Sequence, residues 1–127
     1  MSSKRVTPPE PGFLQHREQA LHNEALLNGS SLPSDWEVTV RFYATAHWVR
    51  AYLKKYLNVS SISSHEEADR LLERAKVQRE LRQLFKELRW ASEDARYYCV
   101  HPSSAQLYRC RQAHNRLRGF FEPKITP

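Results

Sequence analysis

The chain has 127 residues, 40% of them hydrophobic and 27% charged, enough for one domain with an apolar core. No stretch approaches the roughly 18 uninterrupted apolar residues of a membrane span, and no apolar run follows the N-terminus as in a secretory signal. Three glycines are too few for the clustered glycine loops of the common nucleotide enzymes. We therefore expect a cytoplasmic protein with no membrane segment, no cofactor and no metal.

Taken in order, the first elements are a tail and a helix. Residues 1–11 contain three prolines and few apolar groups, which predicts a flexible N-terminal tail. Residues 13–27 place apolar side chains at helical spacing, and Asn28-Gly29 then favours a stop in the left-handed conformation. We expect the domain to cover residues 12–122.

The stretch 35–57 predicts the central helix. It holds two of the three tryptophans and neither glycine nor proline. At 100° per residue it shows two apolar faces, which is typical of a helix covered by neighbours on both sides. Glu37, Arg41 and Lys55 mark the strip expected to face solvent, and Ser34 with Glu37 fits a capping box.

Three further helices follow from apolar stripes and caps. A capping box at Ser64–Glu67 starts a helix that carries residues 68–75, and a break is expected near 76–79. The next stripe runs over 81–98 and ends at His101-Pro102. Ser103–Gln106 caps the last helix, and Pro123 ends it, leaving a C-terminal tail over 123–127. No strand pattern is present, so the sequence predicts an all-α, five-helix up-and-down bundle.

The net charge of +6 is concentrated near the C-terminus. Residues 102–127 carry five Lys/Arg against one acid. This excess predicts either a patch for RNA or nucleotide phosphates or an ordinary solvated helix face. The candidate ligand-binding residues there are Arg109, Arg111, Arg116 and Arg118.

Several motifs resemble those of small bacterial and archaeal HEPN-domain proteins, whose initials stand for higher eukaryotes and prokaryotes nucleotide-binding. The resemblance covers roughly residues 13–120. It rests on Ala20-x2-Asn23-Glu24, Trp36-x5-Phe42-Tyr43-Ala44-x2-His47-x3-Ala51-Tyr52-Leu53, Ser64-His65-Glu66-Glu67 and Ser92-x2-Ala95-Arg96-Tyr97.

This resemblance implies an α-helical bundle, commonly a homodimer. Members include metal-independent ribonucleases of toxin–antitoxin, anti-phage and RNA-degrading systems, and non-catalytic partners of nucleotidyltransferases. The ribonucleases pair an Arg with a His four to six residues later, the His acting on the ribose 2′-OH and the Arg on the phosphorane charge. Four pairs in this chain fit that spacing: Arg17–His22, Arg41–His47, Arg96–His101 and Arg109–His114.

Arg96 and His101 lie at the end of the fourth predicted helix, nearest to where the catalytic pair of the family usually lies. The resemblance therefore favours them as the catalytic pair. Tyr97, however, stands where the ribonucleases often carry a polar residue, which favours a role without chemistry.

A second set of candidate ligand-binding residues lies on the central helix and just after it. Tyr43, His47, Arg50 and His65 suit a polar binding site, although histidines at such positions also occur simply packed in a core.

Three functions therefore stay open. In the first, the chain is a binding module for RNA, nucleotide or a protein partner such as a nucleotidyltransferase or an antitoxin. Alternatively it is a ribonuclease, or a purely structural interaction protein.

Overall fold

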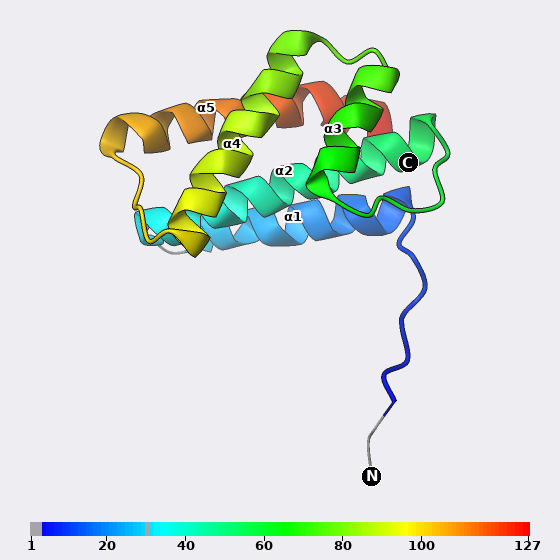
Figure 1. Ribbon diagram of the computed structural model, residues 1–127, viewed down its shortest axis with the longest axis horizontal. Coiled ribbons are helices and arrows are strands. Elements are labelled where there is room, and N and C mark those ends of the chain that lie inside the picture. The colour runs from blue at the N-terminus through cyan, green and yellow to red at the C-terminus, as the bar shows by residue number, and fades with distance from the viewer. Residues whose placement is uncertain (1–3, 30) are drawn as a thin grey trace.

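The computed structural model describes residues 4–29 and 31–127, and every regular element in them is helical. The predicted all-α five-helix bundle is confirmed (Figure 1). In chain order the elements are α1 (Phe13–Gly29), α2 (Ser34–Tyr56), α3 (His65–Arg74), α4 (Arg79–Tyr97), α5 (Ser104–Phe121) and the short 3-10 helix η1 (Glu122–Ile125).

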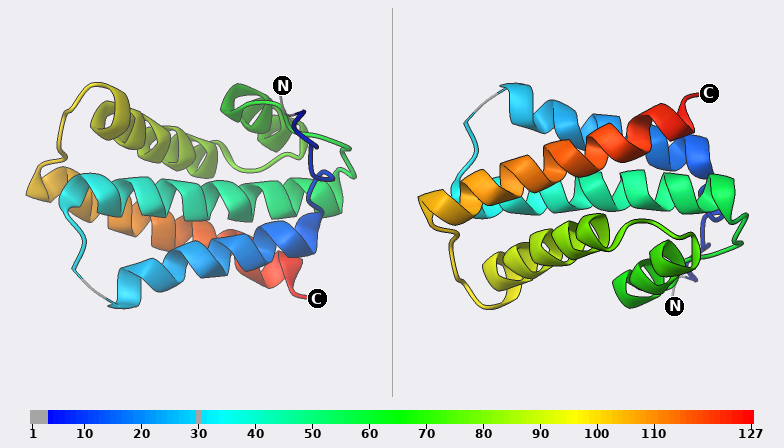
Figure 2. Two further views of the ribbon diagram at one scale, coloured as in Figure 1. Left: turned by 90° about the horizontal axis from the view of Figure 1, so that it is seen from below. Right: turned by 90° about the horizontal axis from the view of Figure 1, so that it is seen from above.

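The other helices pack around α2. It contacts α1, α3, α4, α5 and η1, and Figure 2 shows it running through the middle of the bundle, with α1 on one side and α3 and α4 on the other. Phe42, Trp48 and Leu53 of α2 have no exposed surface. Its two apolar faces thus form the core, as expected for a helix apolar on two sides.

The helix ends follow local rules that the sequence already indicates. The Ser64 side chain accepts from the backbone N–H of Glu67, and Ser103 and Gln106 form a full capping box. The break after α3 is a Schellman turn, in which Lys76 adopts a φ of 62° and the backbone N–H of Val77 donates to Leu72 O at 3.0 Å.

Two predictions about α1 and α2 are wrong. Ser34 is the first helical residue rather than a cap, and Pro33 before it offers no side-chain cap. The carboxylate of Glu37 consequently does not reach back to the chain but lies against α5, as described below. α1 includes Gly29, and no glycine in the described residues has a positive φ.

The C-terminal segment also differs from the predicted tail over 123–127. η1 continues from α5, and its Ile125 is completely buried. At the other end of the chain, residues 4–11 have no regular structure and run away from the helices in Figure 1. In the described part of the chain, no helix combines the length and hydrophobicity needed to cross a membrane.

Candidate binding site

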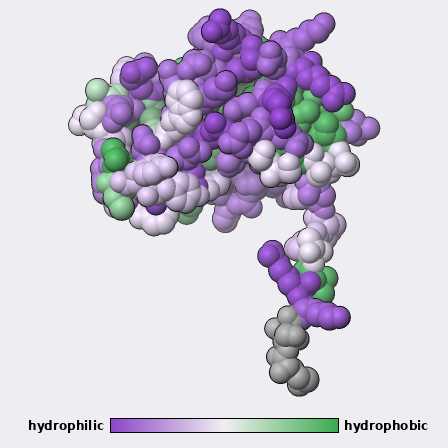
Figure 3. Space-filling model, viewed as in Figure 1, coloured by the Kyte–Doolittle hydropathy of each residue, from purple (hydrophilic) through white to green (hydrophobic). Residues whose placement is uncertain are grey.

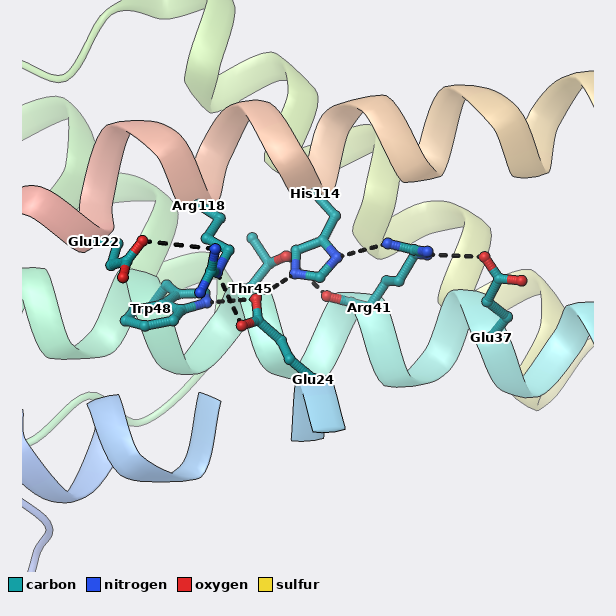
Figure 4. A network of polar contacts seen from close by, with 8 residues as sticks. All are labelled: Glu24, Glu37, Arg41, Thr45, Trp48, His114, Arg118 and Glu122. Carbon is teal, nitrogen blue, oxygen red and sulfur yellow. Dashed lines mark hydrogen bonds and ion pairs between the residues drawn. The ribbon is translucent and has the colours of Figure 1, made fainter. Parts of the chain in front are cut away.

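Two polar clusters flank α2. The first, which we call the buried network, joins α1, α2 and α5 and consists of Glu24, Glu37, Arg41, Trp48, Arg111, His114 and Arg118. Figure 4 shows all of these side chains except Arg111. The second, which we call the α2 polar strip, joins α1, α2, α3 and α4 and consists of His16, Tyr43, His47, Arg50, His65 and Arg96.

His114 is the centre of the buried network. Its side chain is 3% exposed, and its Nδ1 lies 2.9 Å from Arg41 Nη1 while its Nε2 lies 2.7 Å from Glu24 Oε2. A guanidinium only donates hydrogen bonds and a carboxylate only accepts them, so we assign His114 as the neutral tautomer with the proton on Nε2. A second proton on Nδ1 would point at the Arg41 guanidinium.

Glu24 of α1 accepts hydrogen bonds from three side chains on two helices, α2 and α5. Trp48 Nε1 donates to it at 2.9 Å, and so does Arg118 Nε, in addition to His114. Burial by itself raises the pKa of Glu24, but the bonds from His114 and Trp48 outweigh it and hold the pKa below its ordinary value. The carboxylate is therefore ionised and acts as the acceptor that ties α1 to α2 and α5.

Glu37 forms the other end of the network. Arg111 donates to it through Nε at 2.7 Å and Nη2 at 2.9 Å, and Arg41 donates through Nε at 2.8 Å. The bonds from Arg111, opposed by burial and reinforced by Arg41, lower the pKa of Glu37 to about 2. The prediction that this strip of α2 faces solvent is thus wrong for Glu37 and Arg41. Glu37 is 9% exposed, and Arg41 is partly covered by α5.

In the α2 polar strip, His16 of α1 meets His47 of α2. Their Nδ1 atoms are 2.9 Å apart, so one ring must donate and the other accept. Burial is the main cause that lowers the pKa of each histidine to about 4. His47, Arg50 and Lys54 lower the pKa of His16 further. Arg50 also lowers the pKa of His47. Both rings are neutral near pH 7.

Arg96 lies at the α4 end of the strip. Its Nη1 donates to the Tyr43 hydroxyl at 2.6 Å and to the Tyr97 hydroxyl at 2.9 Å, and its Nε donates to Ser92 Oγ at 3.0 Å. The guanidinium carbon is 5.0 Å from the Tyr43 ring centre and 4.7 Å from that of Tyr97, within cation–π distance. Two aromatic rings therefore hold the cation in place, and no acid among the described residues forms an ion pair with it.

Arg50 and His65 occupy the middle of the strip. Arg50 Nη1 donates to the backbone oxygen of Ile62 at 2.9 Å. The His65 ring stands edge-on to Phe42 at 5.0 Å, and its buried Nδ1 has no hydrogen-bond partner in the described chain. Burial, followed by Arg50 and Arg89, lowers the pKa of His65. The structure thus brings the predicted residues Tyr43, His47, Arg50 and His65 into one strip.

The predicted arginines of α5 are placed differently, because each has an acidic partner. Arg109 lies 3.9 Å from Glu87 and Arg116 lies 3.1 Å from Glu80. Arg111 and Arg118 bind Glu37 and Glu24 of the buried network. By contrast, no carboxylate of the described residues lies within 4 Å of Arg50 or Arg96.

The predicted catalytic pair is not assembled within one chain. The bonds of Arg96 go to Ser92, Tyr43 and Tyr97, whereas the exposed His101 lies 4.0 Å from Asp35. No hydrogen bond in the described chain joins the two members of any of the four Arg–His pairs in the sequence. Arg41 instead pairs with His114, 73 residues away.

The buried network was missed because its members come from three helices. One signal was present: Glu24 shares the apolar spacing of the first helix, and Glu37 and Arg41 are four apart on the most apolar helix. Charged residues in such positions are rarely buried unless they are paired. Within the described residues no group of three or more His, Cys, Asp or Glu side chains is placed to hold a metal ion.

Comparison of the chain with protein-family models, curated proteins and solved structures gives no match. The HEPN-like assignment therefore stays a prediction that rests on the motifs of the sequence.

Proposed function

We propose that the chain is a cytoplasmic, HEPN-like binding module that holds a phosphate group of RNA or of a nucleotide at the α2 polar strip and performs no chemistry of its own. The observation that carries this proposal is that no carboxylate of the described residues lies within 4 Å of Arg50 or Arg96, whereas the α5 arginines all have acidic partners; Glu10 and Glu67 act on Arg50 only from a greater distance. Both guanidiniums are partly buried and anchored, so an incoming phosphate meets donors that are already ordered.

Aromatic rings beside Arg96 suit the bases that accompany such a phosphate. Tyr97 is 66% exposed and Tyr43 is 36% exposed. Unpaired bases stack on rings of this kind, at about 1–3 kcal/mol per base, whatever their sequence. Single-stranded RNA is therefore the preferred ligand, and a free nucleotide is the smaller alternative.

Binding of a fluorescein-labelled single-stranded RNA, followed by anisotropy over a range of salt concentrations, tests the proposal. Arg96→Gln is expected to weaken binding about tenfold and to reduce the salt slope by about 0.7, the value for one lost phosphate contact. Arg116→Gln is the matched control, because it removes the same charge from an exposed side chain that is already paired with Glu80. Equal affinity of all three proteins would contradict the proposal.

The same samples separate binding from cleavage. RNA recovered intact from the wild-type mixture on a denaturing gel supports the module without chemistry. Cleavage without added metal that disappears in a folded Arg96→Ala/His101→Ala variant would instead establish the ribonuclease alternative.

We further propose that the module works as a homodimer through the end of the bundle where α4 leads into α5. Large apolar and aromatic side chains gather there, visible as green and white atoms at the lower left of Figure 3. Aromatic residues of this kind are enriched in protein interfaces. The exposed members are Trp36, Trp90, Tyr98, Val100 and Tyr108.

Light scattering after size exclusion tests the dimer. Tyr98→Asp is expected to give a monomer, because Tyr98 is 71% exposed in the single chain and would be desolvated in the dimer. Leu26→Asp, on the exposed side of α1, is the control and should leave the mass unchanged. A wild-type monomer would refute the homodimer and leave a nucleotidyltransferase or antitoxin as the partner to seek.

A further inference from the structure

We infer a second binding site, for a small oxyanion such as phosphate, in the pocket where Arg41 and Arg111 meet Glu37. It lies in the buried network and shares no residue with the α2 polar strip. The inference therefore stands or falls independently of the proposed function.

The pocket has a suitable size and position. It measures about 240 Å³ and is bounded by the C-terminal end of α1, the segment before α2, and α5. Sites for drug-sized ligands usually measure about 300–1,000 Å³, so this pocket suits a smaller group. Its lining residues are Leu27, Ser31, Leu32, Glu37, Arg41 and Arg111.

The pocket carries one net positive charge. Arg41 and Arg111 share a single carboxylate, because Glu37 accepts from both of them. His114, the next group in the network, is neutral in the tautomer that its two partners require. One cationic charge is thus left without a counterion in a partly enclosed space, where attraction for an anion is stronger than at an open surface.

Donors for that anion remain free after the internal bonds are made. Arg41 uses Nε for Glu37 and Nη1 for His114, and Arg111 uses Nε and Nη2 for Glu37. Arg41 Nη2 and Arg111 Nη1 have no hydrogen-bond partner in the described residues. A guanidinium offers five N–H donors, so the two side chains can together receive two oxygens of one phosphate or carboxylate.

The pocket is already ordered and has a built-in reporter. Glu37 and His114 fix the Arg41 guanidinium on two sides, so binding an anion requires little reordering of that side chain. The chain of bonds then continues from His114 through Glu24 to the Trp48 indole N–H. A change at Arg41 should therefore shift the NMR resonance of Trp48, whereas the exposed indoles of Trp36 and Trp90 serve as internal controls.

The experiment is a titration of the full chain with inorganic phosphate at constant ionic strength, followed by ¹H–¹⁵N NMR of the three indole groups. Acetate, titrated in the same way, shows whether the pocket takes a carboxylate as well. The variants are Arg111→Gln, which removes the net charge, and Arg116→Gln, which removes an equal charge on the same helix outside the pocket. Glu37→Gln raises the pocket charge by one and keeps both guanidiniums.

We expect a saturable shift of Trp48 alone in the wild type, weakened about tenfold or more in Arg111→Gln and unchanged in Arg116→Gln. Glu37→Gln should bind at least about fourfold more tightly, because one further unit charge ~5 Å away gives that gain even at a water-like dielectric constant. A merely structural Arg–Glu–Arg cluster predicts no such gain.

Two results would overturn the inference: no saturable response to either anion, or the same response in Arg111→Gln as in Arg116→Gln. If Glu37→Gln does not fold, the comparison of these two arginine variants still decides whether the anion binds in this pocket. RNA binding at the α2 polar strip is unaffected by either outcome.

Discussion

Glu24 offers the sharpest test of how this bundle is held together. Its carboxylate accepts from Trp48 Nε1 and His114 Nε2, and these two donors belong to side chains that are 0% and 3% exposed. Glu24→Ala leaves both donors buried without an acceptor. Each such loss costs about 1–3 kcal/mol, whereas the half-buried Arg118 contributes less than about 1 kcal/mol. We therefore expect the free energy of unfolding to fall by about 3–5 kcal/mol.

Glu24→Gln separates the two causes of that loss. The amide oxygen can take the place of Oε2 and accept from Trp48 and His114, while the amide nitrogen faces Arg118, which can turn to Glu122 at 3.6 Å or to solvent. Only the charge of the acceptor is then lost, so we expect a smaller cost of about 1–2 kcal/mol. Glu18→Ala, at an exposed position of the same helix, should stay within about 0.5 kcal/mol of the wild type.

The assay is urea denaturation followed by far-ultraviolet circular dichroism, with the stabilities compared at equal m-values. A Glu24→Ala stability within about 0.5 kcal/mol of Glu18→Ala would refute the network as a stabilising unit. If Glu24→Gln were as costly as Glu24→Ala, the charge rather than the buried donors would account for the effect.

Three further predictions concern stability. Because the pKa values of His16 and His47 fall from 6.5 to about 4 on folding, the unfolded chain binds more protons than the folded chain between these pH values. The free energy of unfolding should therefore rise by about 1–3 kcal/mol from pH 4 to 6.5 and then level off. This rise should be smaller in His47→Gln, and it is absent if the pair does not form. Lys76→Gly should stabilise the chain by about 0.5–1 kcal/mol in thermal unfolding, because its φ of 62° favours glycine; a loss of stability would contradict the turn. Ile125→Ala should cost about 2–4 kcal/mol in urea, since the side chain is completely buried; a cost below about 0.5 kcal/mol would return the segment to the predicted tail.

The helices and most of their ends could be predicted because their causes are local. Ser64 and Ser103 bond to backbone groups three residues away, and the apolar stripe of each helix is a property of that helix alone. The central place of α2 follows in the same way from its two apolar faces.

The polar sites could be predicted only in part. The strip residues Tyr43, His47 and Arg50 share one helix, so their neighbourhood was visible in the periodicity. The burial of Glu37 and Arg41 was not, because it depends on α5 covering the third side of α2. A polar strip covered by another helix has the same sequence pattern as one that faces water.

The tryptophans illustrate the same limit. Trp36 and Trp48 lie on the same helix, for which the sequence predicts two apolar faces. Trp48 is completely buried and donates to Glu24, whereas Trp36 is 59% exposed. Neighbouring helices cover Trp48 and also Glu37 of the first turn, but they leave Trp36 of that same turn open. The spacing of apolar residues alone does not specify which parts of α2 the neighbouring helices cover.

The attachment of α1 connects the two polar clusters. α1 packs mainly on α2, where its Ala20 is buried and its Phe13 and Leu21 lie against the core. The polar contacts of His16 and Glu24 add to this apolar packing at two points, eight residues or about 12 Å apart along the helix. At that separation, with no shared partner, protonation of the histidine pair and loss of the Glu24 acceptor should weaken the docking of α1 additively. The helix is thus fastened at two independent points, one sensitive to pH and the other to the loss of an acceptor.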